Sequence, residues 1–290
     1  MLHFIYNPMA GGGAAAAAKA RIEEALNGRG TEARFHATQG RRDAMRIARE
    51  LSEGGAVDIV AMGGDGTLNE VLNGLADPAR VRLGLIPCGS GNDFAAAAHI
   101  PLDPIEALEL VLAGEAKPTD YMECSGVRGI NAIGTGIDVD ILRRYARMKL
   151  LKGSAAYLAS LVVTLFDYRP YQFEEITPAG GRETHRAFIA CAANGVSFGG
   201  GIPISPRSVI DDSLMDIVIV DNIKKPGIPG AFIKLMQRRV LELKSTVYKR
   251  QDRLQIVSNQ PLPIQIDGEI YEDLPFDVHL VKGGLRMYRP

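Results

Sequence analysis

The first half of the chain alternates regularly between strand-like and helix-like segments. Short apolar runs, typical of strands buried on both faces, lie near residues 2–6, 33–38, 57–62 and 82–87. Helical patterns lie near residues 14–27, 42–53, 67–75 and 103–113. Such alternation builds a mainly parallel sheet that is covered by helices on both faces. The sequence therefore predicts a three-layer α/β domain at the N-terminus.

The pattern changes after about residue 119. Strand-like segments with turn signals between them then predominate, near residues 171–176, 187–192, 215–220, 253–257 and 276–281. This pattern of short strands and turns is typical of a mostly antiparallel β domain. At 290 residues the chain is long enough for two domains, so we expect a boundary near residues 119–125.

A glycine-rich loop follows the third predicted strand. It consists of Gly63, Gly64, Asp65, Gly66, Thr67, Leu68, Asn69 and Glu70. Glycines let the backbone turn sharply and approach a ligand, and Thr67 with Glu70 has the spacing of a capping box that starts a helix. A helix N-terminus favours phosphate, and Asp65 beside it implies a cation, for which Mg²⁺ is expected. The alternative is an ordinary strand-to-helix turn with an incidental aspartate.

A second loop of the same kind follows the fourth predicted strand. Residues 89–94 lead into an alanine-rich helix, with Asn92 or Asp93 as the expected capping residue. Ligands of open α/β sheets bind outside the carboxyl ends of parallel strands, so the two loops could hold two parts of one nucleotide. An ordinary strand-to-helix connection is the competing interpretation of this loop.

Charge and cysteine content favour a cytosolic enzyme. A formal net charge of -1 argues against a nucleic-acid partner, which needs a concentrated basic surface. Cys88, Cys124 and Cys191 show no metal or redox spacing and no even disulfide set, which indicates a reduced compartment. The N-terminal residues run directly into a predicted strand without the regions of a signal peptide.

Asp267 and Glu269 are candidates for acid–base chemistry. Two residues apart, they would share one face of a strand and could converge on a ligand. The competing interpretation is a hairpin turn at Asp267-Gly268, which would leave both carboxylates in solvent. The residues alone favour the turn.

Several segments, taken together and in order, resemble the catalytic domain of the diacylglycerol kinase family, which includes sphingosine and ceramide kinases. They are residues 7–11, 63–67, 87–95, 194–195 with 199–201, 211–216 and 266–269. The resemblance covers nearly the whole chain and is greatest to the single-chain bacterial enzymes. It implies a nucleotide-binding domain of residues 1–121, to which residues 285–290 return, and a β-rich lipid-binding domain of residues 122–284.

The resemblance also implies an activity, transfer of the γ-phosphate of ATP to a lipid hydroxyl, with Mg²⁺ as cofactor. Diacylglycerol is the expected acceptor, giving phosphatidate. Glu269 is then the proton acceptor for that hydroxyl, and Asp267 belongs with Asp65 to a carboxylate, water and Mg²⁺ network. The nucleotide-binding positions are Asn7, Pro8, Gly11, Gly12, Thr38, Gly63 to Glu70 as named above, Ser90, Gly91 and Asn92.

A structural Mg²⁺ site is implied at the Asp212 carboxylate with the carbonyls of Val209 and Leu214. A surface turn is the alternative there, because the chain has serine at position 213 where the family usually has glycine. Ala10 likewise replaces a family serine and removes a hydroxyl from the first loop, where the N–H groups of Gly11 and Gly12 could still serve.

Residues 141–152 suggest how the protein reaches a membrane lipid. Arg143, Arg144, Arg147, Lys149 and Lys152 accompany Ile141, Tyr145 and Met148 at helical spacing, which suits an anionic bilayer. An uninvolved exposed helix fits equally well. Residues 154–166 are uncharged but too short to span a membrane, so they belong to the core or to the rim of a lipid pocket. We expect a cytoplasmic protein, peripheral at the inner membrane face, and a homodimer is possible.

Three other functions compete with a diacylglycerol kinase. Gly11, Gly13 and Ala16 match the dinucleotide fingerprint of a dehydrogenase. The acidic residue that the fingerprint requires should end the second strand, whereas Glu32 lies at the beginning of that strand. NAD kinases share the Gly-Gly-Asp-Gly-Thr loop, although the segment 89–95 favours a lipid kinase. A non-catalytic binding protein would be expected to lack Asp65 or the Asp267 and Glu269 pair, and the chain has all three. Among lipid acceptors, a sphingoid base, monoacylglycerol or a polyprenol would use the same machinery.

Overall fold

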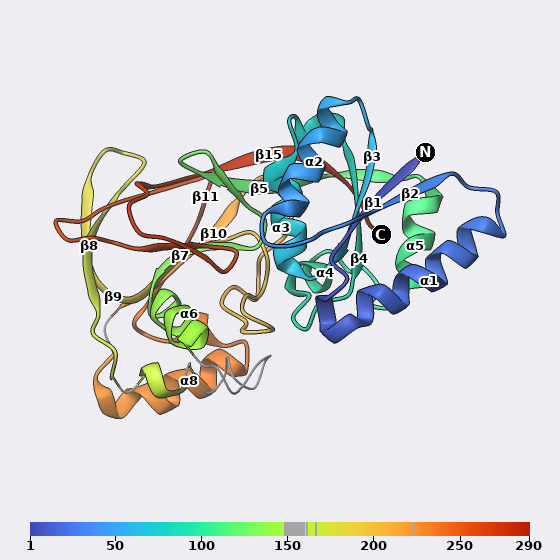
Figure 1. Cartoon of the computed structure of the whole chain (residues 1–290). Helices are drawn as coiled ribbons and strands as arrows, with labels where there is room; N and C mark the ends of the chain where they lie inside the picture. Colours follow the sequence, from blue (N-terminus) through green and yellow to red (C-terminus); the bar gives the residue numbers. More distant parts are fainter. Residues whose placement is uncertain (148–159, 161, 166, 222) are drawn as a thin grey trace. The chain divides into compact units, whose positions relative to one another are not determined.

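The chain divides into two compact units. In the computed structural model, residues 1–147, 160, 162–165, 167–221 and 223–290 are described. Unit 1 comprises residues 1–120 and 282–290, and unit 2 comprises residues 121–281. Figure 1 shows the course of the chain through both.

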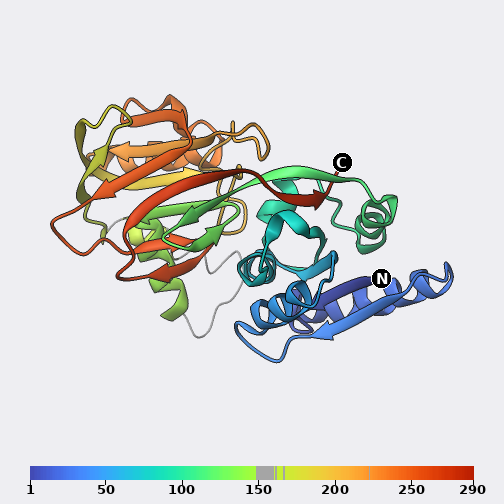
Figure 2. The same ribbon diagram turned by 90° about the horizontal axis from the view of Figure 1, so that it is seen from above.

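Unit 1 is built on a parallel sheet. Its strands are β1 (Leu2–Tyr6), β2 (Ala33–Ala37), β3 (Asp58–Gly63), β4 (Arg82–Pro87) and the end of β15 (Phe276–Tyr288). They lie in the order β2-β1-β3-β4-β15, and every neighbouring pair is parallel. The last strand (red in Figure 2) joins β4 through Arg286 and Met287. Side chains of the central strands, such as Phe4 and Val60, are fully buried, as strands covered on both faces require.

Helices cover the sheet of unit 1 in two pairs. Helix α1 (Ala14–Asn27) packs on α5 (Pro104–Ala113), and α2 (Asp43–Glu53) packs on α3 (Asp65–Gly74). Figure 1 shows the two pairs on opposite sides of the strands. Helix α1 turns Ile22 and Leu26 inward at helical spacing. The shorter elements are η1 (Ala10–Gly13), η2 (Pro78–Arg80) and α4 (Asp93–Ala97). The predicted α/β domain is confirmed.

Unit 2 is a β structure whose pairings are antiparallel. Its strands are β6 (Val127–Gly129), β7 (Ala132–Gly136), β8 (Tyr171–Ile176), β9 (Arg182–Ala193), β10 (Met215–Asp221), β11 (Thr246–Gln251), β12 (Arg253–Val257), β13 (Ile264–Ile266) and β14 (Glu269–Tyr271). They are joined by the end of β5 (Ala116–Cys124) and the start of β15. Strand β9 is central, because it pairs with β7, β8 and β10. The predicted antiparallel β domain is confirmed.

Two buried clusters stabilise unit 2. One is formed by inward-facing strand residues such as Phe173, Ile217 and Leu254. The other lies beneath α6 (Ile137–Arg147) and α8 (Ile228–Met236) and includes Phe188 and Val218. The short helices η3 (Lys225–Gly227) and η4 (Val240–Glu242) also belong to unit 2. Helices therefore cover one side of the strands, and a β core fills the other.

Part of the segment considered for membrane contact is described. Ile141 is buried and contributes to the cluster under α6, so the expectation that it faces a bilayer is wrong. Arg143 pairs with Glu272, and Arg144 with Asp167. Residues 148–159, 161 and 166 lie outside the described residues, as do the side chains of Tyr145 and Arg147.

Candidate functional site

Three glycine-rich loops begin at the carboxyl ends of neighbouring strands in unit 1. Loop A (residues 7–13) follows β1, loop B (63–66) ends β3 and begins α3, and loop C (88–92) follows β4. The parallel register aligns Tyr6 with Met62, and Gly63 with Pro87, so the three loops start at one edge of the sheet. This is the edge where ligands of open α/β sheets bind.

The three loops touch one another at glycines. A Cβ on Gly11 of loop A would lie 2.2 Å from the carbonyl oxygen of Cys88 in loop C. A Cβ on Gly89 of loop C would lie 2.5 Å from the Cα of Gly64 in loop B. Any side chain at Gly11 or Gly89 would therefore push the loops apart. The absence of a side chain at these glycines therefore allows the three loops to pack in direct contact.

Loop A surrounds open space on its outer side. Gly11, Gly12 and Gly13 have φ angles of 59°, 67° and 103°, a left-handed run that glycine adopts at the least cost. An added Cβ at Gly12 or Gly13 would meet nothing within 4 Å, and the same holds for Gly66 of loop B. The run leads directly into the N-terminus of α1, which favours an anion. Loops A and B can therefore admit a phosphate.

Other predicted nucleotide-binding residues lie at the same edge. Asn7 accepts the N–H of Met9 through its side chain, which shapes the turn at Pro8. The N–H of Thr38, just beyond β2, donates to the carbonyl of Tyr6. Ser90 and Gly91 are exposed in loop C. These contacts do not test nucleotide binding. The roles of Asn7, Pro8, Thr38, Ser90 and Gly91 in it therefore stay predictions.

Asp65 connects loop B to loop C. One carboxylate oxygen accepts the N–H of Asp93 at 3.1 Å, and the other accepts the N–H of Phe94 at 3.0 Å. Asp65 thus caps α4 from another segment of the chain. The expectation that Asn92 or Asp93 caps this helix with its own side chain is wrong, because Asn92 instead exchanges two hydrogen bonds with Gly89.

The expected capping box of Thr67 and Glu70 is also wrong. Helix α3 begins at Asp65 after Gly64, with no side-chain cap. Glu70 points elsewhere, and its carboxylate accepts the N–H groups of Arg42 and Ala44 at the start of α2. Thr67 and Asn69 are buried, and Leu68 belongs to the core. Glu70 therefore contributes by fixing α2 against α3.

In unit 2, Asp267 and Gly268 form the hairpin turn between β13 and β14. Asp267 has a φ of 46° and Gly268 of 91°, so the two do not continue a strand. The expectation that Asp267 and Glu269 share one face of a strand is therefore wrong, because Asp267 lies in the turn. Asp267 is nevertheless not free in solvent, because its carboxylate accepts the N–H groups of Ile130, Asn131 and Ala132 at 2.7–3.0 Å.

Glu269 is the exposed first residue of β14. The carboxylate of Asp267 thus anchors the turn that carries Glu269. The segment 130–132 is held in turn by Asn194, whose side-chain amide donates to the carbonyl of Ile130 at 2.9 Å. The backbone N–H groups of Asn194 and Gly195 both donate to the carbonyl of Asn131. Residues 194–195 belong to the segments that carry the family resemblance, whereas residues 130–132 carry no signal of their own in a single sequence.

The proposed structural metal site at Asp212 contains a cationic side chain. The guanidinium of Arg250 pairs with the Asp212 carboxylate, which also accepts the N–H of Leu214. Val209 is exposed nearby in the chain. Because Arg250 already balances the charge of Asp212, a metal ion would have to share or displace that pairing. The Asp212 site stays a prediction.

Unit 2 also contains an apolar pocket. It encloses about 680 Å³ of empty space, including its opening to solvent, and lies among α6, β9, β10 and α8. The lining is aliphatic and aromatic, with Asp138 as its acidic side chain. Burial raises the pKa of Asp138 to about 7. The apolar lining suits the binding of an apolar group.

Comparison with known proteins agrees with this geometry. Residues 1–124 match the model of the diacylglycerol kinase catalytic domain, and residues 131–289 match that of the YegS C-terminal NAD kinase beta sandwich-like domain. The chain belongs to the diacylglycerol kinase family. As a member of that family it is an ATP-dependent lipid kinase.

Two relatives and one solved structure illustrate the likeness. A Chromohalobacter salexigens protein named "Probable lipid kinase YegS-like" is 31% identical over 259 residues, which are 86% of this chain and 81% of that protein. The "Diacylglycerol kinase" of Bacillus subtilis is 30% identical over 279 residues, 93% of this chain and 90% of that protein. A structure from Bacillus anthracis str. Sterne matches with a TM-score of 0.82 at 24% identity, covering 100% of this chain and 95% of that chain. The last comparison shows a shared fold.

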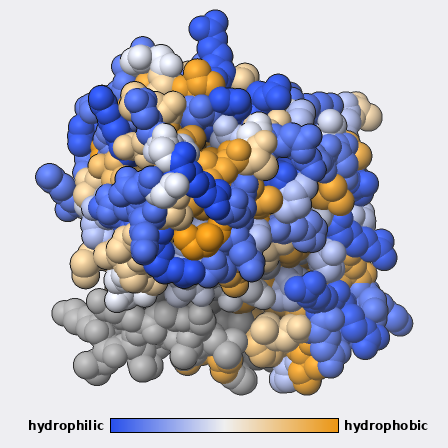
Figure 3. All heavy atoms as spheres, turned by 90° about the vertical axis from the view of Figure 1, so that its right-hand side faces the viewer, coloured by the Kyte–Doolittle hydropathy of each residue, from blue (hydrophilic) through white to orange (hydrophobic). Residues whose placement is uncertain are grey.

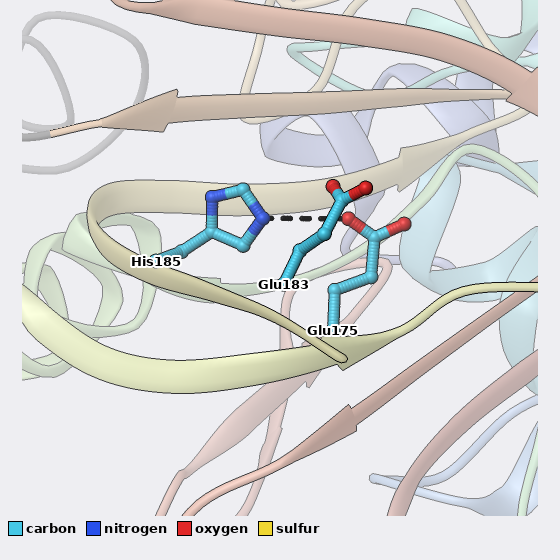
Figure 4. A group of neighbouring side chains, drawn as sticks. All are labelled: Glu175, Glu183 and His185. Carbon is cyan, nitrogen blue, oxygen red and sulfur yellow. Dashed lines mark ion pairs between the residues drawn. The ribbon is translucent and has the colours of Figure 1, made fainter. Parts of the chain in front are cut away.

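The lipid kinase also has a partly buried charged cluster in unit 2. Glu175, Glu183 and His185 lie close enough to hold a metal ion (Figure 4). The ammonium of Lys249 lies 2.9 Å from Glu175 and 2.7 Å from Glu183. His185 approaches Glu175 on one side and Asp221 on the other, at 3.5 and 3.2 Å. Lys249 already supplies positive charge between the two glutamates, so the cluster is stable as an ion-pair network.

This cluster predicts a pH-dependent stability. The close approach of the Glu175 carboxylate, followed by the hydrogen bond with Asp221, raises the pKa of His185 above its usual 6.5, although burial acts in the opposite direction. The stabilisation is therefore complete below pH 6.5 and is lost as the pH rises through the folded-state pKa. We expect the free energy of unfolding of wild type to fall over that range relative to His185→Gln. Urea titrations at several pH values measure this, with the exposed His279→Gln as control. Equal pH dependence in wild type and His185→Gln would contradict it.

Proposed function

We propose that this lipid kinase transfers the γ-phosphate of ATP to the hydroxyl of diacylglycerol, giving phosphatidate and ADP, with Mg²⁺ as the metal. The observation that most favours an acyl-bearing acceptor is the apolar pocket of unit 2. The observation that favours a phosphate donor is the set of three touching glycine loops in unit 1. The Bacillus subtilis relative named "Diacylglycerol kinase" supports the choice of acceptor.

The proposed reaction breaks the bond between the γ-phosphorus and the β–γ bridging oxygen. A new bond forms between the γ-phosphorus and the lipid hydroxyl oxygen, and the hydroxyl proton passes to Glu269. Loops A and B bind the phosphates through backbone N–H groups and the N-terminus of α1. Glu269 is exposed at the start of β14, where a substrate hydroxyl can approach it from solvent.

Asp65 fits the role of a Mg²⁺ ligand. Each of its carboxylate oxygens accepts a backbone N–H at the start of α4, and a carboxylate is the kind of oxygen ligand that Mg²⁺ or its water shell prefers. Open space lies beside Gly66 in the same loop. Bound Mg²⁺ would neutralise the charge that develops on the phosphates during transfer.

NAD is the principal alternative acceptor, because the β domain is of the NAD kinase-like type. The pocket argues for a lipid, since a nucleoside needs several hydrogen-bonding partners and the pocket lining is almost entirely apolar. No helix in the described part of the chain is both long and apolar enough to cross a bilayer. The face in Figure 3 presents mainly hydrophilic residues, with hydrophobic ones between them. We propose that the kinase meets its lipid as a peripheral protein at the inner membrane face.

Filling the pocket tests the proposed acceptor. Ala231 lies on α8 and lines the pocket, so we expect Ala231→Trp to raise the KM for long-chain diacylglycerol about tenfold and leave the KM for ATP unchanged. Ala20→Trp, at an exposed position of α1, is the matched control. Steady-state kinetics in mixed micelles give both constants. Unchanged kinetics for long-chain diacylglycerol in a correctly folded Ala231→Trp protein would refute the assignment of the pocket.

A further inference from the structure

Helix α8 presents an apolar stripe to solvent. Ile233 is 55% exposed and Met236 is 43% exposed. Pro229 and Gly230 are exposed at helical spacing from Ile233, so the stripe carries no charge along the helix. The outer face of a helix that meets only water is normally polar or charged. An outward stripe of this kind indicates contact with something other than water.

Basic residues surround this stripe. The segment 222–241 contains five basic residues and no acidic one, whereas the whole chain has a formal net charge of -1. Lys224, Arg238 and Arg239 are exposed at the two ends of α8. Arg239 pairs with Glu242, just beyond the segment, which leaves the local excess of positive charge in place. Apolar residues flanked by cations are complementary to a surface that is both apolar and anionic.

We propose that the outer face of α8, with the basic residues at its two ends, is a docking surface for an anionic lipid bilayer. The helix would lie in the plane of the interface, with Ile233 and Met236 among the acyl chains and the cations at the headgroups. This surface consists of other residues than the segment 141–152, for which membrane contact was expected from the sequence.

The position of α8 links this surface to the pocket. Ala231, Phe232 and Leu235, on the other side of the same helix, line the apolar pocket and are partly exposed. A lipid that leaves the bilayer beside α8 therefore meets apolar side chains along one helix. The link to the pocket rests on the proposed function, whereas docking itself does not.

Vesicle sedimentation tests the docking surface. Purified protein is mixed with vesicles of phosphatidylglycerol or of phosphatidylcholine, and the bound fraction is measured. We expect wild type to bind the anionic vesicles and the double variant Ile233→Glu with Met236→Glu to bind them at least about tenfold more weakly. Lys224→Glu with Arg238→Glu should weaken binding and reduce its dependence on salt. Leu102→Glu is the matched control, because Leu102 is 63% exposed in unit 1.

Two results would overturn the docking surface. The first is binding to anionic vesicles that the α8 variants do not weaken. The second is a dimer in light scattering that the α8 variants dissociate while vesicle binding stays unchanged, which would make α8 a surface for a second copy. Phosphate transfer to a short-chain diacylglycerol in detergent separates this question from catalysis. We expect the α8 variants to keep that activity, and a wild type inactive on every lipid would count against the proposed function alone.

Discussion

We expect Asp65→Ala to lower kcat by about 1,000-fold, because the carboxylate would hold the cation that neutralises the transferring phosphate. The same substitution removes the cap of α4, where Asp65 accepts the N–H groups of Asp93 and Phe94. It should therefore also lower the free energy of unfolding by about 1 kcal/mol, the usual effect of losing a helix cap. Steady-state kinetics and urea denaturation measure the two effects on one protein.

Asp103→Ala separates chemistry from capping. The Asp103 carboxylate caps α5 by accepting the N–H groups of Ile105 and Glu106, so it matches Asp65 in its structural role. It should lose a similar amount of stability, also about 1 kcal/mol, and keep its kcat. If Asp65→Ala behaves like Asp103→Ala in both measurements, Asp65 is a structural residue and the metal model fails.

Glu269→Gln is expected to lower kcat about 100-fold, because an amide cannot accept the proton of the lipid hydroxyl. Glu269 is exposed, so the variant should unfold at the same urea concentration as wild type. Steady-state kinetics with a single diacylglycerol provide the comparison.

Asp267→Ala provides the contrasting variant two residues away. Its carboxylate accepts three backbone N–H groups, so its loss should lower the free energy of unfolding by about 3 kcal/mol. The pair is thus expected to separate into one catalytic and one structural carboxylate. A Glu269→Gln protein with near-normal kcat would contradict the assignment of Glu269 as the base.

The α/β unit was predictable because its signals are local. Four strands and their helices carry apolar runs with the correct periodicities, and the structure places each within a few residues of the prediction. The antiparallel strands 171–176 and 253–257 were predictable for the same reason. Strands β13 and β14, at three residues each, are too short to show a period.

Side-chain partners could not be predicted, because they join segments far apart in sequence. Thr67 and Glu70 have the spacing of a capping box, yet Glu70 bonds to Arg42 and Ala44. Asp65 caps a helix that begins nearly 30 residues later. In both cases tertiary packing provided a partner that local spacing does not reveal.

The hairpin at Asp267 shows a second feature that could not be predicted from the sequence. The turn signal of Asp-Gly was correct, but the fate of the carboxylate depends on where residues 130–132 lie in the fold. A single sequence does not show that distant N–H groups will surround Asp267. The sequence therefore identified the candidate residues. Which of them have a structural role and which a catalytic one depends on the fold.

Transfer of labelled phosphate from Mg-ATP tests whether the protein is a diacylglycerol kinase. The acceptors are diacylglycerol, monoacylglycerol, a sphingoid base and a polyprenol in mixed micelles, with NAD in a parallel reaction. We expect label in phosphatidate, strongly reduced by Glu269→Gln and by Asp65→Ala. Label in phosphorylated NAD, with none in any lipid, would contradict this expectation.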